Sequence, residues 1–283
     1  DLKIGAKIGE GGFGEVYLAS NSIHSKLAVK ILKRTDVEST ELWDQYKEQL
    51  LQEGQRLKDA EHDNVVKVYS LVYKEENDTV YLTMEYCSNG SLNHFCKKGP
   101  LTMTQTRSYM HGAALGLHAI HSRGMLHRDI KPSNILIGDD EKVKIADFCL
   151  VTNDLINGYA KYPSKLYKNH IAKEVFDTWI TSAKTDIWAF GMTIYRLLHG
   201  DLFLSTELTE EPYLLVQQGN FTKNLPWLPH IPDKWRRFVR KAMHDDPARR
   251  FDSMTEVINA IKKLPVKPDW ECEYFPHQVR WHR

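Results

Sequence analysis

The chain has 283 residues, 42% of them hydrophobic, and a nearly balanced charge of 38 Lys and Arg against 37 Asp and Glu. This balance excludes a nucleic-acid-binding protein that relies on a large basic excess. The apolar content excludes a highly charged disordered chain. No apolar run approaches the ~18 residues that a membrane-spanning helix requires. We therefore expect a folded protein with no nucleic-acid partner and no membrane segment.

The cysteines indicate a reducing environment. Cys87, Cys96, Cys149 and Cys272 are scattered, and none belongs to a C-x-x-C pair. The pattern is neither a disulfide framework nor a zinc motif. We therefore expect a cytoplasmic or other intracellular location. The chain begins at Asp1 without a signal-like segment, which we interpret as an excised domain or processed fragment.

Strand signals dominate the first part of the chain. Apolar and polar residues alternate over 1–33, and β-branched and aromatic residues are frequent in 65–73 and 79–85. This period of two predicts three strands in the first range and one in each of the others. Between them, apolar residues recur about every 3.6 positions, which predicts a helix over 41–60.

Helix signals dominate beyond residue 91. Thr102-x-x-Gln105 is a capping-box pattern that predicts a helix running to about Arg123, and Ser253-x-x-Glu256 predicts a second such start. We expect two short strands over residues 135–137 and 143–146. A stretch without clear period follows over 152–174, and the remainder, 181–264, is expected to be mostly helical.

The composition changes near residues 88–91, which divides the chain into lobes. We predict a small β-rich lobe over 1–87 and a larger helical lobe over 88–264. Residues 265–283 are rich in Pro, His and aromatic residues and read as an extended tail. This tail either packs on a lobe surface or docks on a regulator or a neighbouring domain.

A glycine-rich motif, Gly9-Glu-Gly11-Gly12-Phe-Gly14, fits the pattern G-x-G-x-x-G. In dinucleotide-binding folds the last glycine opens a helix, whereas here residues 15–18 read as a strand. A glycine hairpin can cover a triphosphate with its backbone N–H groups, because no side chain keeps the phosphates away. An ordinary glycine hairpin is the alternative for this motif taken alone.

Charged residues suited to phosphate chemistry follow. Lys30 ends Ala28-Val29-Lys30 on the predicted third strand, and Glu53 lies on the predicted helix. A lysine that holds phosphates needs a carboxylate to orient it. Farther along the chain come His127-Arg-Asp129-Ile-Lys131-Pro-Ser-Asn134 and Asp147-Phe148-Cys149. Phosphoryl transfer needs such residues because alignment and charge neutralisation, more than covalent chemistry, lower its barrier.

With these motifs the sequence resembles the eukaryotic-type serine/threonine protein kinase family over residues 1–264. Asp186-Ile-Trp-Ala-Phe-Gly191 and Asp246-Pro-Ala-Arg-Arg250 add to the resemblance. It implies an α+β, bilobal fold with a five-stranded antiparallel sheet and one helix in the small lobe. It also implies transfer of the γ-phosphate of ATP to Ser or Thr hydroxyls of protein substrates.

By resemblance, Asp129 is the catalytic base, and Lys131, which is typical of the serine/threonine type, contacts the γ-phosphate. Mg²⁺, with Mn²⁺ as an alternative, is expected on Asp147 and Asn134. Lys30, oriented by Glu53, is expected on the α- and β-phosphates. The adenine site is expected to use the glycine loop, three aliphatic side chains, a gatekeeper methionine and two backbone positions, namely Gly9, Gly11, Gly12, Gly14, Val16, Ala28, Leu136, Met84, Glu85 and Cys87.

The resemblance implies structural roles for other residues. His127 and Phe148 are expected to pack in an internal stack, and Asp186 is expected to anchor the catalytic loop. Glu174 is expected to pair with Arg250. These are packing and positioning roles, not catalytic ones.

The sequence departs from the family pattern in three places. Cys149 replaces a glycine, and its Cβ restricts the loop; a thiol switch is the alternative to a tolerated substitution. The usual Ala-Pro-Glu is Ala172-Lys173-Glu174, and residues 164–170 lack the pattern that shapes the substrate platform.

Arg128 precedes the catalytic aspartate, and kinases of that type often need an anion in the activation segment. Candidate phosphorylation sites are Thr152 and Ser164, and the alternative is a segment that orders itself without phosphate.

Three functions are compatible with these residues. An active serine/threonine protein kinase is the first, because every catalytic position is filled. A pseudokinase, which binds nucleotide or a partner without transfer, is the alternative suggested by Cys149 and the altered activation segment. A small-molecule kinase of the aminoglycoside type is the third, but such enzymes usually lack Lys131 and the Asp186 helix motif.

Overall fold

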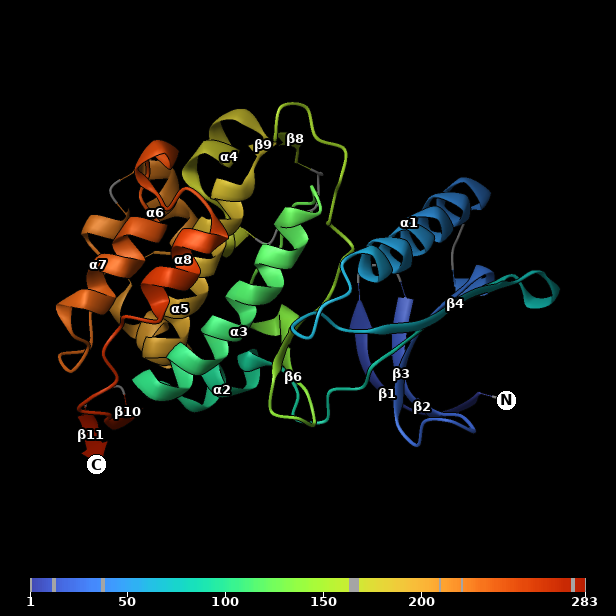
Figure 1. Cartoon of the computed structure of the whole chain (residues 1–283), viewed down its shortest axis with the longest axis horizontal. Helices are drawn as coiled ribbons and strands as arrows, with labels where there is room; N and C mark the ends of the chain where they lie inside the picture. Colours follow the sequence, from blue (N-terminus) through green and yellow to red (C-terminus); the bar gives the residue numbers. More distant parts are fainter. Residues whose placement is uncertain are drawn as a thin grey trace.

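A computed structural model describes residues 2–11, 14–36, 39–162, 168–208, 210–219, 221–275 and 278–282. The chain folds into a small lobe and a larger helical lobe, seen at the right and left of Figure 1. Gly12 and Ser164 lie outside the described residues. Within the described residues, no helix is both long and apolar enough to cross a bilayer.

The small lobe is an antiparallel sheet with one long helix packed on it (Figure 1). The strand order is β1-β2-β3-β5-β4. The predicted strands and helix are all present, although the fourth strand begins at Val68, three residues later than expected. The bounds are β1 Lys3–Gly11, β2 Gly14–Ser20, β3 Leu27–Lys33, α1 Thr40–Asp59, β4 Val68–Lys74 and β5 Thr79–Met84.

The period of two decides which side of the sheet each β3 residue faces. Leu27, Val29 and Ile31 are buried in a small cluster with Ala19. Leu32, which shares a face with Lys30, packs in the main core with residues of α1. The alternation therefore turns Lys30 toward the helix.

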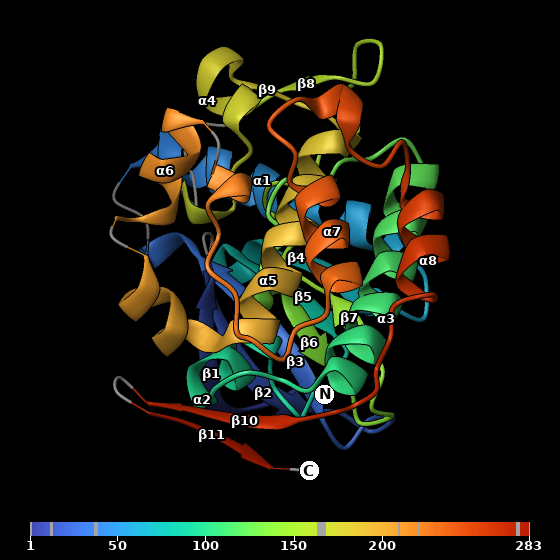
Figure 2. The ribbon, with the colours of Figure 1, turned by 90° about the vertical axis from the view of Figure 1, so that its left-hand side faces the viewer.

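The large lobe is built around α5, Ala183–Glu207, which other helices surround in Figure 2. The predicted capping box at Thr102 and Gln105 opens α3. Gly200 has φ 77° and interrupts α5 where the chain passes Gly99. The other elements are α2 Leu92–Lys98, α3 Met103–Ser122, β6 Ile135–Ile137, β7 Val143–Ile145, β8 Ala160–Lys161, α4 Lys173–Thr178, β9 Ile180–Thr181, α6 Pro212–Gln218, α7 Asp233–Ala242 and α8 Met254–Ile261.

The second predicted capping box is only half formed. The Ser253 side chain accepts a hydrogen bond from the Glu256 amide, as expected. Glu256 Oε2 instead accepts from the amide of Asp252 at 2.8 Å, and its Oε1 pairs with Lys241. The Glu256 carboxylate therefore bonds to Lys241 and the Asp252 amide, and not to the Ser253 amide as a capping box requires.

The tail is a β-hairpin of β10, Glu271–Phe275, and β11, Gln278–His282. It lies along one end of the large lobe (Figure 2). The Tyr274 ring meets Phe203 edge-on at 5.4 Å, and its hydroxyl donates to Glu207 at 2.9 Å. Of the two expected arrangements of the tail, packing on a lobe surface is the one found.

Candidate active site

A buried ion pair joins β3 to α1. Lys30 Nζ lies 2.6 Å from Glu53 Oε2, and the two side chains are 5% and 3% exposed. Glu53 sits on the buried face of α1 between Leu50 and Leu57. Gly54 lets the helix lie close to the sheet, because a Cβ there would approach Leu71 Cδ2 to 2.9 Å. The sequence therefore delivers both charges to one point.

The environment keeps Lys30 charged. Burial is the largest single influence and lowers the pKa of Lys30, but the neighbouring groups, led by the Glu53 carboxylate, together raise it by more, so the net pKa lies above the usual lysine value. An ammonium held this way retains a donor for an anionic ligand.

The predicted catalytic loop, residues 127–134, brings together three of the predicted residues. Asp129 Oδ2 accepts from Lys131 Nζ at 2.7 Å and from Asn134 Nδ2 at 2.8 Å. Asn134 Nδ2 also donates to the Asp129 carbonyl at 2.9 Å. The Asp129 carboxylate is thus fixed from two sides within its own loop.

Asp186, at the start of α5, binds two backbone amides of this loop. Its Oδ2 accepts from the His127 amide at 2.8 Å and its Oδ1 from the Arg128 amide at 2.7 Å. His121 Nε2 lies 2.8 Å from Oδ2 and has no motif that predicts this contact. Burial raises the pKa of Asp186, but the neighbouring groups, led by His121, together lower it by more. The net pKa therefore lies below the usual aspartate value, and the group stays ionised.

Asp147 and Phe148 follow β7 and differ in exposure, since Phe148 is buried and Asp147 is half-buried. Phe148 is fully buried and meets the His127 ring edge-on at 5.4 Å, and it shares the main core with Leu57. Asp147 has φ 61°, a left-handed conformation that costs energy for a residue other than glycine. Such a backbone persists only where the surrounding structure holds it.

The Asp147 carboxylate fits a divalent cation. Its Oδ1 is buried and has no hydrogen-bond partner within the described residues. Burial raises the pKa of Asp147, but Lys30 leads the contacts that lower it, so the net pKa is below the ordinary value. An ionised carboxylate with an unpaired oxygen is a donor that Mg²⁺ prefers.

The residues predicted to bind adenine come from both lobes. Val16 pairs with Lys30 across β2 and β3, and Ala28 pairs with Met84 across β3 and β5. Leu136, on β6 of the large lobe, is half-buried. The predicted adenine site therefore draws on strands of both lobes.

Within the glycine loop, the fold itself requires a glycine at position 14. Its φ is 120°, and a Cβ there would collide with the carbonyl of Ile31 on β3. Gly9 and Gly11 pair with Val16 and Gly14 across the β1–β2 hairpin. The context argument, a strand after the glycines, is confirmed.

Arg128 already has partners in the predicted activation segment, the stretch between Asp147 and Glu174. Its side chain donates to the Leu150 carbonyl and, at 2.8 Å, to the Lys161 carbonyl. Thr152 is only 7% exposed and exchanges two backbone hydrogen bonds with Leu126. The structure therefore does not support Thr152 as a phosphorylation site, because the residue is buried and its backbone is held in a β-bridge.

The predicted pair of Glu174 and Arg250 is present as a double hydrogen bond. Arg250 Nη1 and Nη2 donate to the two carboxylate oxygens at 2.6 and 2.7 Å. The arginine side chain is fully buried. The pair ties α4 to the segment before α8, even though lysine replaces proline beside Glu174.

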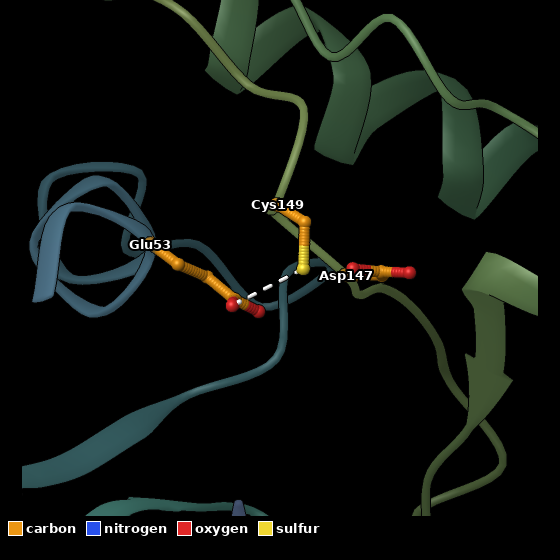
Figure 3. A group of neighbouring side chains, drawn as sticks. All are labelled: Glu53, Asp147 and Cys149. Atoms are coloured by element: carbon orange, nitrogen blue, oxygen red, sulfur yellow. Dashed lines mark hydrogen bonds between the residues drawn. The ribbon is translucent and has the colours of Figure 1, made fainter. Parts of the chain in front are cut away.

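Cys149 occupies a place that sequence reasoning did not foresee. Its sulfur lies between the Lys30–Glu53 pair and Asp147, and Figure 3 shows the three side chains Glu53, Asp147 and Cys149 converging. Burial raises the pKa of the Cys149 thiol, so it is not a reactive thiolate. A raised thiol pKa disfavours the thiol-switch alternative, because oxidation proceeds through the thiolate.

Comparison with known proteins agrees with this geometry. A family model described as "Protein kinase domain" matches residues 2–261. Serine/threonine-protein kinase plk-1 of Caenorhabditis elegans is 31% identical over 250 residues, which cover 87% of this chain. Serine/threonine-protein kinase TOS3 of Saccharomyces cerevisiae is 34% identical over 71% of this chain, and PrkC of Bacillus subtilis is 28% identical over 90%.

This chain spans 37% to 40% of the length of these curated relatives. The family model, by contrast, matches all of this chain except residue 1 and residues 262–283. The chain therefore belongs to the protein kinase domain family.

Proposed function

We propose that the chain transfers the γ-phosphate of ATP to serine and threonine hydroxyls of protein substrates. The observation that carries this proposal is the formed set of charges at the junction of the lobes. The Lys30–Glu53 pair is closed at 2.6 Å, and Asp147 has a buried oxygen without a protein partner. The named serine/threonine kinases among the relatives support the substrate class.

Nucleotide binding is assigned to groups of both lobes. We assign the α- and β-phosphates to the Lys30 ammonium and the backbone of the glycine loop. The adenine edge is assigned to the Glu85 carbonyl and the Cys87 amide, because the Glu85 amide already donates to Lys67 and the Cys87 carbonyl already accepts from Gly90. Met84, in register with Ala28, is assigned to the back of the pocket.

Asp147 and Asn134 are assigned to Mg²⁺, which neutralises phosphate charge when bound. Asp129 orients the substrate hydroxyl and accepts its proton, a role typically worth ~10²–10⁴ in rate. Lys131, 2.7 Å from Asp129, places a positive charge beside the site of transfer. Preorganised charges of this kind supply the main stabilisation that phosphoryl transfer requires.

The alternatives receive less support. A pseudokinase would be favoured by a missing catalytic side chain, but all five predicted residues are present. Lys30 pairs with Glu53, which lies near Asp147, and Asn134 bonds to Asp129. We include an intracellular location in the proposal because ATP is the donor and the four cysteines are free thiols.

A peptide panel tests the proposal. Four peptides with identical flanks carry Ser, Thr, Tyr or Ala at one position, and transfer from Mg·ATP is followed by mass. We expect phosphate on the Ser and Thr peptides only, and none with Asp129→Asn. Transfer to Tyr alone, or to an aminoglycoside but no peptide, would contradict the proposal.

A further inference from the structure

Cys149 connects the two lobes at the centre of the site. Lys30 and Glu53 belong to the small lobe, whereas Asp147 and Cys149 belong to the segment after β7 of the large lobe. Cys149 Sγ lies 3.1 Å from Lys30 Nζ and 3.2 Å from Glu53 Oε2. With the 2.6 Å ion pair, these three atoms form a closed triangle.

The hydrogen-bonding capacity of the groups fits this triangle. The ammonium of Lys30 has three donors, and the carboxylate of Glu53 only accepts. A thiol accepts through its sulfur lone pairs and donates through its S–H. Cys149 can therefore accept from Lys30 and donate to Glu53 at once, which leaves one lysine donor for a phosphate.

Two other uses of this cluster fit less well. Glu53, Asp147 and Cys149 offer atoms within 4.8 Å of one another, which is a spacing that suits a metal ion. The Lys30 ammonium, however, lies among these atoms and already supplies the positive charge. Oxidative modification proceeds through the thiolate, and the raised pKa of this half-buried thiol favours its protonated form.

The backbone does not require a glycine at this position. The left-handed residues in this part of the site are Arg128 and Asp147, with φ of 66° and 61°, and Cys149 is not one of them. A Cβ at residue 149 is therefore compatible with the arrangement in which the ion pair is closed. The side chain adds contacts that a glycine lacks.

We propose that Cys149 is a positioning residue for nucleotide binding, whose thiol fastens the Asp147 segment to the Lys30–Glu53 pair across the lobes. It acts through Lys30 and Asp147 and touches no substrate. Because those two residues contact the nucleotide in the ground state as well as in the transition state, losing the thiol weakens ATP binding more than it slows transfer.

Three substitutions separate the thiol from the Cβ. Cys149→Ser keeps a group that both donates and accepts, Cys149→Ala keeps only the Cβ, and Cys149→Gly removes both. Cys272→Ser is the control, because Cys272 is a free thiol with a raised pKa, like Cys149, but lies in the hairpin. The affinity for Mg·ADP is measured by calorimetry, and kcat and KM for ATP are measured with the Ser peptide.

We expect Cys149→Ala and Cys149→Gly to weaken Mg·ADP binding about 10-fold, the effect of losing a hydrogen bond to charged groups. Their KM for ATP rises by a similar factor while kcat changes less. Cys149→Ser recovers most of the affinity, and Cys272→Ser binds Mg·ADP like the unaltered chain. This ranking supports a hydrogen-bonding role for the side chain of residue 149.

Two results would overturn the proposal. Affinity in Cys149→Ala equal to that of the unaltered chain would show that the thiol contacts contribute nothing. Equal losses in Cys149→Ser and Cys149→Ala would show a purely steric role. The kinetic part rests on the proposed function, but the calorimetric ranking does not, so an inactive chain that still shows the ranking would refute the kinase proposal alone.

Discussion

The catalytic loop and the activation segment are fixed in different ways. Side chains hold the catalytic loop, since Asp186 accepts from two of its amides and Asn134 bonds to Asp129. Backbone groups hold the activation segment, through the pairing of β8 with β9 and the carbonyls that Arg128 reaches. Sequence motifs predict many of the side-chain bonds in the catalytic loop, whereas the backbone contacts of the activation segment leave no such pattern.

Removing the charges of the phosphate site is the strongest way to break the first region. We expect Lys30→Met and Asp147→Asn each to reduce peptide phosphorylation at least ~100-fold, because each removes a preorganised charge. The thermal midpoint should show that both variants remain folded. Near-normal turnover in either variant would contradict the site assignment.

Asp129→Asn is the sharper test of the same loop. The amide keeps the size of the side chain but cannot accept the substrate proton, so we expect transfer to fall by ~10²–10⁴. Mg·ADP affinity should stay close to that of the unaltered chain, since Asp129 is assigned to the hydroxyl and not to the nucleotide. If turnover persists, another residue is the base.

Arg250→Met tests a side-chain tie that supports the activation segment. The variant leaves the Glu174 carboxylate without its double hydrogen bond in a partly buried place. Breaking a buried pair in this way typically costs about 3–5 kcal/mol of unfolding free energy. Denaturant unfolding measures the loss, and the exposed pair of Lys173 and Asp177, broken by Lys173→Met, is the matched control. Equal effects in the two variants would show that burial of the Arg250 pair is unimportant.

Buried histidines make the large lobe sensitive to acid. Burial lowers the pKa of His199 to about 3 and that of His230 to about 4, against roughly 6.5 in the unfolded chain. Below pH ~6.5 the unfolded state therefore binds more protons, and the free energy of unfolding falls as the pH falls toward these values.

Denaturant unfolding at pH 7.5 and 5.0 measures this acid sensitivity. His230→Phe removes one titrating group whose ring nitrogens have no hydrogen-bond partner within the described residues. We expect this variant to lose less stability between the two pH values than the unaltered chain does. An unchanged difference would argue against a role for His230.

The smallest expected effect is that of phosphatase treatment. Arg128 already donates to two carbonyls of the activation segment, so the segment does not need a phosphate to pair with it. We expect the same peptide phosphorylation rate before and after treatment, with complete dephosphorylation checked by mass. A large loss of rate would show that an anion is required after all.

Much of the fold could be predicted because its signals are local. The alternation in β3, the helical spacing of α1 and the capping box at Thr102 each lie within one element. The hairpin of β10 and β11 was missed because aromatic and proline-rich residues resemble an irregular tail. The half-formed cap at Ser253 was misread because Lys241, on another helix, competes for Glu256.

In the site, too, the residues that belong to local motifs could be predicted, whereas contacts between distant parts of the chain could not. Lys30, Glu53, Asp129, Asn134 and Asp147 are motif residues, and the structure brings the expected groups of them together. The contact between His121 and Asp186 and the contacts of Cys149 were not foreseen. Each joins side chains far apart in the sequence, and no spacing rule connects them.

The most direct test of the central claim is the intact mass of the purified chain during incubation with Mg·ATP and a generic protein substrate. Asp129→Asn, treated identically, is the control. The account predicts that the chain or its substrate gains mass in steps of one phosphate, and only with the unaltered chain. No gain in either protein, or equal gains with Asp129→Asn, would contradict the claim that this site transfers phosphate.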